Sequence, residues 1–443
     1  MKVLIIAAGK GERLKPLIKD LPKPLTPLLG LSLIERVILT CRKTGFREFL
    51  VVVGFKSQMI KNKIGNGQKY KVNIGYIENN EWTKGNGISV LKAKDFLKEE
   101  FILLMADHIF DVKILEKIRD FCINKDECVL AIDKNPTRFI DIQEATKVKT
   151  EGDYIIDIGK NISDYDGLDC GIFKATPVLF EALEESVKKG AQTLTDGIRL
   201  LAKNKRMRYL EIEKDNFWID IDTPSDLKKA EKILCKDLVK LTDGPISRFL
   251  NRPISIRISK FLVRTEVTPN FISFLSFGLS IISAWFFSLG DYLSNILAGV
   301  IAQLSSIIDG CDGEIARLKF KESKYGAWFD AVLDRYADAL IIIGMTIGIY
   351  RFLMEPKILI TGFLALTGSF MMSYTADKYD SIFRKKKVLP KVRLGRDVRL
   401  FLIMIGAFFN KIFLTLFILA LFSNLEVARR LYIVKKKKEE FFS

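Results

Sequence analysis

Long apolar stretches dominate the second half of this sequence and restrict what it can fold into. Six largely apolar stretches follow residue 270, at 271–289, 292–316, 326–350, 357–376, 398–413 and 414–433. A helix of about 20 such residues crosses the ~30 Å hydrocarbon core of a bilayer, and several of these stretches are long enough. We therefore predict that residues 269–443 form an all-α domain of six transmembrane helices.

The first 236 residues follow a different pattern, in which short β-rich runs alternate with helical ones. The runs that predict strands lie at 49–53, 72–77, 101–105 and 128–132, and helical patterns lie at 33–43 and 112–121. This alternation predicts an α/β domain with a doubly wound sheet. We expect the β-rich stretch 147–173 to be an insertion that carries hairpins. The sheet resumes near 207–212, and a helix over 225–236 ends the domain.

Composition agrees with this division and excludes several chemistries. The chain of 443 residues is 49% hydrophobic, yet 28% of its residues are charged and its net charge is +17. The single histidine, His108, excludes histidine-rich zinc sites and makes a Ser-His-Asp triad improbable. The six cysteines form no C-x-x-C pair, which is typical of reduced cysteines in a protein that faces the cytosol.

Residues 237–268 are predicted to be an amphipathic juxtamembrane linker. Apolar and basic residues interleave over 245–264, as in a segment that lies on an anionic membrane surface, and Pro253 would bend it. A linker helix packed on protein fits the same pattern.

Basic residues also gather in the connections between the apolar stretches, at 317–324, 384–387 and 435–438. The connection at 290–295 has no Lys or Arg. With six spans this asymmetry predicts a multi-pass protein of the cell membrane whose soluble domain and both termini are cytoplasmic. The positive charge then requires no nucleic-acid partner, because membrane lipids and phosphorylated substrates account for it.

A phosphate-binding loop is predicted at the start of the chain. The apolar run 3–6 leads into a turn with Gly9 and Gly11, followed by Arg13. Glycines let backbone N–H groups approach phosphate oxygens closely. Downstream, Lys23 lies between two prolines, which suits it to contact a phosphate.

Acidic residues complete the expected phosphate site. Asp107 follows the buried strand predicted at 101–105, and Asp220 and Asp222 lie in a second short apolar run. Carboxylates at the carboxyl ends of parallel strands lie where open α/β sheets bind ligands, and oxygen ligands suit Mg²⁺ or Mn²⁺. Asp220 and Asp222 fit the pattern about equally well.

Together these motifs resemble the nucleotide-sugar pyrophosphorylase family of nucleotidyltransferases, over residues 1–232. The resemblance implies that Gly9, Gly11 and Arg13 hold a triphosphate, that Lys23 contacts phosphate, and that Asp107 and Asp220 bind the metal. The stretch 84–89 matches the loop near the base and sugar, where Gly87 is the candidate. For His108 we expect a supporting or packing role beside Asp107.

A second acidic motif lies at the ends of two predicted spans. Asp309 and Asp312 are three residues apart, and Asp330 and Asp334 are four apart, so each pair shares one helix face. Charged groups at this depth are costly and are usually functional. Four carboxylates indicate Mg²⁺ or a similar ion for phosphoryl transfer. An ion-coupled transporter site, or a salt-bridge network with Arg317 and Arg335, is the structural alternative.

The full motif, D-x-x-D-G-x-x-A-R-x8-G-x3-D-x3-D, is the signature of CDP-alcohol phosphotransferases, and this sequence meets every position from Asp309 to Asp334. The resemblance implies metal binding by Asp309, Asp312, Asp330 and Asp334, with Asp334 also taking the proton of the acceptor hydroxyl. Gly313 leaves room for substrate and Arg317 neutralises its phosphate. Arg396 and Arg429 are candidates for binding an acceptor phosphate.

The two resemblances interlock, because a cytidylyltransferase makes the CDP-alcohol that the second enzyme consumes. The whole chain thus resembles the bifunctional inositol-1-phosphate cytidylyltransferases and di-myo-inositol-phosphate-phosphate synthases of thermophiles. This implies CTP, inositol 1-phosphate and CDP-inositol as partners; a homodimer through the membrane domain is also possible. One alternative is a phosphocholine- or phosphoethanolamine-type cytidylyltransferase fused to a phospholipid synthase. Another is a cytidine-nucleotide sensor that regulates a membrane transporter.

Overall fold

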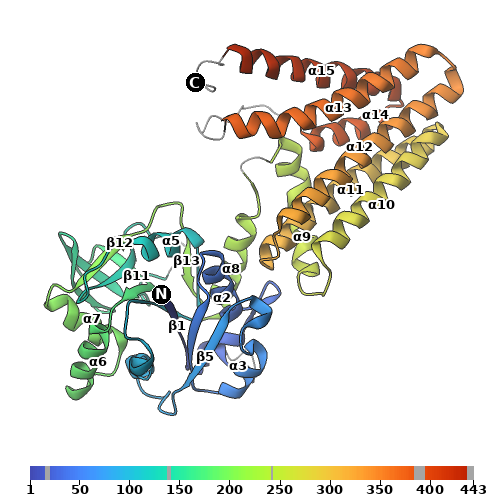
Figure 1. Cartoon of the computed structure of the whole chain (residues 1–443). Coiled ribbons are helices and arrows are strands. Elements are labelled where there is room, and N and C mark those ends of the chain that lie inside the picture. The colour runs from blue at the N-terminus through green and yellow to red at the C-terminus, as the bar shows by residue number, and fades with distance from the viewer. Residues whose placement is uncertain (15–19, 137–140, 241–242, 384–394, 437–443) are drawn as a thin grey trace. The chain divides into compact units, whose positions relative to one another are not determined.

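The computed structural model describes residues 1–14, 20–136, 141–240, 243–383 and 395–436 (Figure 1). The chain divides into two compact units, Met1–Leu234 and Cys235–Ser443. Each unit is described by itself.

A nine-stranded sheet forms the centre of the first unit, in the order β5-β4-β1-β6-β11-β8-β12-β10-β9. Its strands are β1 (Lys2–Ala7), β4 (Glu48–Val53), β5 (Asn73–Glu78), β6 (Phe101–Met105), β8 (Cys128–Asp133), β9 (Lys147–Glu151), β10 (Tyr154–Gly159), β11 (Gly167–Ala175) and β12 (Met207–Glu211). Strands β5, β4, β1 and β6 are parallel neighbours, as are β8 and β12. The strands expected from the sequence are present within about a residue of their predicted ends.

The sheet differs from the doubly wound prediction because it is mixed. Strand β11 runs antiparallel to both of its neighbours, β6 and β8, in the middle of the sheet. We expected 147–173 to be an insertion, and only the β9–β10 hairpin has that character. Strand β11 is central because eight of its nine residues are buried, which an edge strand would not allow.

Helices flank this sheet, and two small ribbons extend from it. The helices are α2 (Leu33–Lys43), α3 (Ser57–Ile64), α4 (Asn86–Leu91), α5 (Val112–Asp120), α6 (Val178–Lys188), α7 (Leu194–Lys203) and α8 (Pro224–Lys236), with short 3₁₀ turns η1 (Glu12–Leu14), η2 (Lys23–Leu25), η3 (Gln68–Tyr70) and η4 (Lys94–Phe96). The ribbons are β2 (Pro27–Leu28) with β3 (Leu31–Ser32), and β7 (His108–Phe110) with β13 (Trp218–Asp220). The β7–β13 ribbon matters most for function, because it places residues more than 100 positions apart side by side.

All of the regular secondary structure in the described part of the second unit is helical. Its elements are the short π-helix η5 (Ser247–Asn251) and the helices α9 (Arg252–Leu262), α10 (Pro269–Leu289), α11 (Tyr292–Leu318), α12 (Lys324–Leu353), α13 (Pro356–Phe383), α14 (Arg396–Phe408) and α15 (Ile412–Lys436). Among the described residues, five helices are long and apolar enough to cross a membrane: α10, α11, α12, α13 and α15.

The predicted fifth span is shorter than expected. Helix α14 has 13 residues, about 20 Å at 1.5 Å per residue, against the ~30 Å of a hydrocarbon core. The basic run 384–387, on which part of the predicted topology rests, lies outside the described residues.

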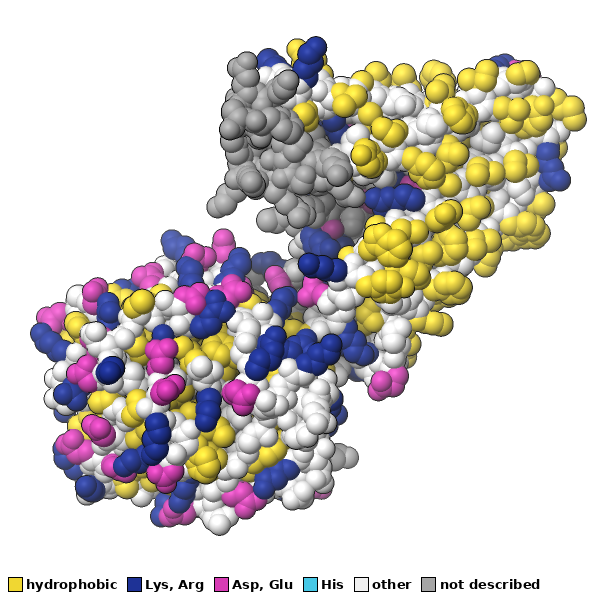
Figure 2. All heavy atoms as spheres, in the orientation of Figure 1, with side chains coloured by type: hydrophobic (Ala, Val, Ile, Leu, Met, Phe, Trp, Pro, Cys, Tyr) yellow, Lys and Arg dark blue, Asp and Glu magenta, His cyan; other side chains and the backbone are white. Residues whose placement is uncertain are grey.

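Close helix packing and an apolar exterior characterise this unit. A side chain at Gly344 or Gly348 of α12 would collide with the backbone of α10 at Ala284 or Phe287, so glycine permits this close approach. Large apolar side chains such as Trp285 and Phe363 are exposed instead of buried. Figure 2 shows hydrophobic side chains spread over the helices of this unit, whereas charged side chains of both signs cover the first unit. Such an exterior suits lipid.

Within the predicted linker, helix α9 and the turn before it have a polar side and an apolar side. Its polar side packs on protein, since Ser255 and Ser259 of α9 are fully buried and both donate hydrogen bonds to Glu314 of α11, at 2.6 and 2.7 Å. Its aromatic residues face outward, with Phe249 85% and Phe261 71% exposed. The linker is therefore both attached to the helix bundle and apolar on its free side.

Candidate active sites

The first site lies where β6 ends. Asp107 follows this buried strand, and the antiparallel pairing of β7 with β13 sets Asp220 opposite His108. A cavity of about 560 Å³ opens here, lined among others by Gly9, Arg13, Asp107, Asp220 and Asp222. The structure thus brings together the loop glycines, the arginine and the acidic residues that the sequence predicts for this site.

A buried lysine joins the acidic residues of this site. The Lys23 ammonium lies 2.5 Å from Asp107 Oδ2, 2.6 Å from Asp222 Oδ1 and 3.7 Å from Asp220 Oδ1. Burial alone would lower the pKa of Lys23, but the three carboxylates hold that pKa above its usual range. Burial would likewise raise the pKa of Asp107, but Lys23 and His108 hold it well below its usual range. Lys23 is therefore a permanent cation at this site.

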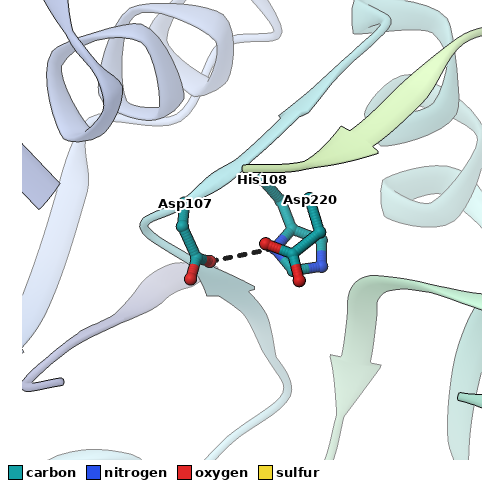
Figure 3. A group of neighbouring side chains, drawn as sticks. All are labelled: Asp107, His108 and Asp220. Carbon is teal, nitrogen blue, oxygen red and sulfur yellow. Dashed lines mark hydrogen bonds and ion pairs between the residues drawn. The ribbon is translucent and has the colours of Figure 1, made fainter. Parts of the chain in front are cut away.

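The single histidine belongs to the same group. Its Nδ1 lies 3.0 Å from Asp107 Oδ1 and 3.8 Å from Asp220 Oδ1, and its ring stacks on Trp218. Figure 3 shows the three side chains converging from the end of β6 and from the β7–β13 ribbon. Burial alone would lower the pKa of His108, but Asp220 and Asp107 raise it to about 9. The ring therefore contacts both candidate metal ligands, as a supporting residue would.

The donor set of this group fits a divalent cation. Ligand atoms of Asp107, His108 and Asp220 lie within 4.8 Å of one another. Asp220 Oδ1 is buried and accepts no hydrogen bond from the residues that the structure describes. Burial raises the pKa of this carboxyl to about 6. Asp222, by contrast, receives hydrogen bonds from Arg13 and Lys23, both at 2.6 Å. A free buried oxygen favours Asp220 over Asp222 as the ligand.

The loop glycines occupy distinct positions. Gly11 has a φ of +69°, and a side chain there would overlap the side chain of Lys23. Gly9 lines the cavity, and a Cβ added there would meet no atom of the described residues within 4 Å. Gly87 is packed against residues 192–193, and its N–H donates to the Gln192 carbonyl at 3.1 Å. Its neighbour Asn86 lines the cavity instead.

Several cavity residues escaped the sequence analysis. Glu144, Lys160 and Asp169 line the wall formed by the region of β9–β11. Asp169 Oδ1 accepts a hydrogen bond from Gly171 N at 2.7 Å, and burial raises the pKa of Asp169 to about 6. In the sequence, each of these residues is only a polar residue near the end of a β-rich run, and no recognisable motif surrounds it. Only the position of β11 in the sheet makes them neighbours of Asp107.

The second site lies between α11 and α12, both of which pack against α10. Carboxylate oxygens of Asp309, Asp330 and Asp334 lie within 4.8 Å of one another. Asp309 accepts a hydrogen bond from Ser276 of α10 at 3.0 Å, and Asp312 accepts one from Ser273. The four predicted carboxylates thus converge, although Asp312 lies beside the group of three. Asp330 Oδ1 is buried and has no hydrogen-bond partner among the described residues, which again fits an oxygen-liganded cation.

A buried arginine neutralises this second group. Arg396 of α14 places Nη1 3.0 Å from Asp309 Oδ2 and 2.5 Å from Asp334 Oδ1, while its Nε lies 3.2 Å from Asp338 Oδ1. The sequence predicts Arg396 as a candidate for binding an acceptor phosphate. The structure also places it within the acidic cluster, because α14 packs against α11.

The other predicted residues of this unit are placed as follows. Arg317 Nη2 donates to the Leu238 carbonyl at 3.1 Å, and its Nε is buried with no hydrogen-bond partner in the described part of the chain. A side chain at Gly313 would approach Arg317 Nη1 to 3.3 Å. Arg429 donates two hydrogen bonds to Glu426, one turn earlier on α15.

Two signals for this site were present in the sequence and were not used. Asp338 continues the four-residue spacing of Asp330 and Asp334. On α10, the serines recur every three or four residues along one face, at Ser273, Ser276, Ser280 and Ser283, and all four are buried. Arg399, the further partner of Asp338, had no comparable signal.

Comparisons with known families now define the class of protein. The nucleotidyl transferase family model matches residues 2–150, and the CDP-alcohol phosphatidyltransferase model matches residues 266–429. The chain therefore joins a nucleotidyltransferase to a CDP-alcohol phosphotransferase in a bifunctional enzyme. This confirms both resemblances seen in the sequence.

Its relatives narrow the class to one family. The protein from Aquifex aeolicus named bifunctional IPC transferase and DIPP synthase is 37% identical over 98% of each chain. The protein of that name from Archaeoglobus fulgidus is 36% identical over 91% of this chain and 78% of its own. This chain belongs to the family of bifunctional IPC transferases and DIPP synthases. The solved inositol-1-phosphate CTP transferase from T. maritima is 24% identical, with a TM-score of 0.48, over 52% of this chain and 94% of that one.

Proposed function

We propose that this enzyme makes CDP-inositol from CTP and inositol 1-phosphate, releasing pyrophosphate, and then transfers the inositol-phosphate group to a second inositol 1-phosphate. The second step releases CMP and forms di-myo-inositol phosphate phosphate. One observation supports this most: a single chain of this family carries two separate carboxylate clusters, each with a free buried oxygen and a buried cation. Two phosphoryl-transfer sites are what a two-step synthesis needs.

In the first step, a phosphate oxygen of inositol 1-phosphate attacks the α-phosphorus of CTP, and the bond to the β-phosphate breaks. The attacking phosphate is already an anion, so positioning and charge neutralisation suffice without a general base. Gly9, Gly11 and Arg13 hold the triphosphate, and Lys23 stabilises the charge that develops on it. Asp107 and Asp220 would hold Mg²⁺ or Mn²⁺, which supplies further neutralisation of the phosphates. Gly87 would lie near the base through its contact with 192–193.

In the second step, a hydroxyl of the acceptor attacks the phosphorus that carries inositol in CDP-inositol, and CMP leaves. A hydroxyl must lose its proton, so a base is useful here, and Asp334 accepts that proton. The metal would be held by Asp309, Asp312 and Asp330, with an oxygen of Asp334. Gly313 and Arg317 would bind the CDP end. Arg396 and Arg429 would bind the acceptor phosphate, with Arg396 the better placed.

Domain limits and topology complete the proposal. Residues 1–236 form the cytidylyltransferase, 237–268 the linker and 269–443 the phosphotransferase. Cytoplasmic placement of both termini requires an even number of crossings, so it depends on α14 crossing the membrane beside the five longer helices. The exposed Phe249 and Phe261 suit contact with membrane lipids. A homodimer through the apolar exterior of the helices is also part of the proposal.

The test supplies purified enzyme in lipid nanodiscs with CTP, Mg²⁺ and one phosphomonoester at a time. We expect pyrophosphate release with inositol 1-phosphate, followed by CMP and a product whose mass corresponds to a phosphorylated di-inositol phosphodiester. Pyrophosphate release with phosphocholine and not with inositol 1-phosphate would favour the phospholipid alternative. Absence of CMP when CDP-inositol and acceptor are both supplied would favour the sensor alternative. Excess EDTA should stop both steps.

A further inference from the structure

A second ion pair lies behind the acidic cluster of the helical unit. Asp338 comes one turn after Asp334 on α12, and Arg399 comes three residues after Arg396 on α14, so each pair shares one helix face. Asp338 and Arg399 are 8% and 6% exposed, and their charged groups lie 2.7 Å apart. A buried charge is costly unless it is paired, so this ion pair stabilises both residues in the interior of the bundle.

Asp338 uses both of its oxygens in this arrangement. Oδ2 accepts hydrogen bonds from Arg399 Nη2 at 2.7 Å and from Ser369 Oγ at 3.2 Å, and Oδ1 accepts one from Arg396 Nε at 3.2 Å. It therefore differs from Asp330, which keeps a free oxygen. Because both of its oxygens accept hydrogen bonds, Asp338 is suited to hold Arg396 in place and is a poor candidate for a metal ligand.

These contacts fix one edge of the Arg396 guanidinium. Its Nε is held by Asp338, and its Nη1 lies against Asp309 and Asp334. Its Nη2 is buried and finds no hydrogen-bond partner among the described residues. A buried N–H donor without a partner is costly, and it is the kind of group that a ligand oxygen satisfies. The planar fork of arginine makes this geometry specific in a way that a lysine would not.

We propose that Asp338, held by Arg399 and Ser369, is a positioning residue for the second transfer step, which orients Arg396 so that its free nitrogen meets the phosphate of the acceptor. This inference rests on the proposed function. It predicts that substitution of Asp338 weakens binding of the acceptor. The first step and the binding of CDP-inositol should not change.

Two variants test it in the full-length enzyme in nanodiscs. Asp338→Asn removes the charge that holds Arg396 but leaves Arg399 unpaired, which threatens folding. The double variant Asp338→Asn with Arg399→Gln removes both charges of the pair, so no unpaired buried charge remains at these two positions. If Asp338 only neutralised Arg399, the double variant would behave as the unsubstituted enzyme does. Arg430→Gln is the matched control, because it disrupts another buried ion pair of the bundle, with Glu426 at 2.9 Å, and leaves both hydrogen bonds from Arg429 to Glu426 in place.

The measurements are the KM values for inositol 1-phosphate and for CDP-inositol in CMP release, with pyrophosphate release as an internal control. For both Asp338 variants we expect the KM for inositol 1-phosphate to rise about 10- to 100-fold, as for residues that orient a neighbouring ligand. The KM for CDP-inositol and the rate of pyrophosphate release should stay near those of the unsubstituted enzyme, and Arg430→Gln should change neither KM.

Several outcomes would overturn the inference while leaving the proposed function intact. These are a double variant with a normal KM for inositol 1-phosphate, a parallel rise of both KM values, or an equal effect of Arg430→Gln. Loss of a monodisperse particle for both Asp338 variants would also count against it, because the residue would then be purely structural. If the unsubstituted enzyme released no CMP, the proposed function itself would fail.

Discussion

Both acidic sites of this enzyme hold several carboxylates close together, and each site neutralises them with a different buried cation. In the first unit, Lys23 lies on a 3₁₀ turn between prolines, and its ammonium contacts Asp107 and Asp222 near the carboxyl end of strand β6. In the second unit, an arginine on a helix meets Asp309, Asp334 and Asp338 inside a helix bundle. Clustered carboxylates repel one another in both places, so each group contains a buried cation beside free oxygens that suit a metal.

The choice of cation matches the chemistry proposed for each site. Lysine is a compact point charge, which is sufficient where phosphate attacks phosphate and only charge must be neutralised. Arginine presents several donors in a fixed plane, which lets it contact three carboxylates and still keep one nitrogen free. The second reaction also needs a base, and Asp334 lies directly beside that arginine. The comparison predicts that the two sites can be inactivated separately.

The largest effect is expected for Asp334→Asn. An amide can neither accept the proton of the acceptor nor bind the metal as a carboxylate does, so CMP release should fall about 10³-fold, within the usual range for a lost general base. Pyrophosphate release from CTP and inositol 1-phosphate should continue unchanged. Both rates are measured on the same preparation. Loss of both activities in a monodisperse protein would show that the sites are not separate.

Asp107→Asn should produce the reverse pattern. It removes a carboxylate that contacts Lys23 and His108, and pyrophosphate release should fall by about 10²- to 10³-fold because preorganised charge stabilisation is lost. CMP release from supplied CDP-inositol should persist. A variant that still released pyrophosphate at the original rate would remove Asp107 from the proposed metal site.

Gly11→Ala sharpens the comparison within the first unit. The φ of +69° disfavours alanine, and its methyl group would displace the Lys23 side chain, so we expect a loss of about 1–3 kcal/mol in the free energy of unfolding and a lower rate of pyrophosphate release. Gly9→Ala is the matched control, because its methyl group meets no neighbour within 4 Å among the described residues. If Gly9→Ala proved the more destabilising of the two in a denaturation experiment, this explanation would be wrong.

The smallest effect concerns His108, and NMR can follow it directly because the chain has one histidine. The imidazole should titrate near a pKa of about 9, above its ordinary value of 6.5, because Asp220 and Asp107 face it. The raised pKa stabilises the fold below pH 6.5, and this contribution disappears as the pH rises through 9. At about 1.4 kcal/mol for each pKa unit, it is at most ~3.5 kcal/mol.

Two changes should lower the midpoint of that titration: Asp220→Asn, which removes a facing charge, and saturating Mg²⁺, whose charge would neutralise the carboxylates that stabilise the protonated imidazole. Glu213→Gln, which removes a carboxylate paired with Lys117 instead, is the control and should leave the midpoint in place. An ordinary midpoint near 6.5 in the unsubstituted enzyme would mean that His108 does not contact the acidic pair.

Local sequence patterns predicted much of this molecule. The strand and helix patterns were sufficient because alternation and the 3.6-residue repeat record which faces are buried, and α2 begins and ends where predicted. The motif spacing likewise placed Asp309, Asp330 and Asp334 on facing surfaces of adjacent helices. The structure adds features that these patterns do not record, all of them where distant segments meet: the sheet is mixed, α14 is shorter than the predicted span, and Arg396 lies within an acidic cluster.

The sequence by itself determined the two kinds of folding unit, the family and most of the charged groups at each site. Hydrophobic periodicity and short motifs are local properties, so a linear reading is enough to find them. Only the tertiary structure decided that β11 is central, that Asp220 and not Asp222 keeps a free oxygen, and that Arg396 and Asp338 belong to the acidic cluster. These features depend on which segments far apart in the chain pack together, and pairing of buried charges follows from that packing.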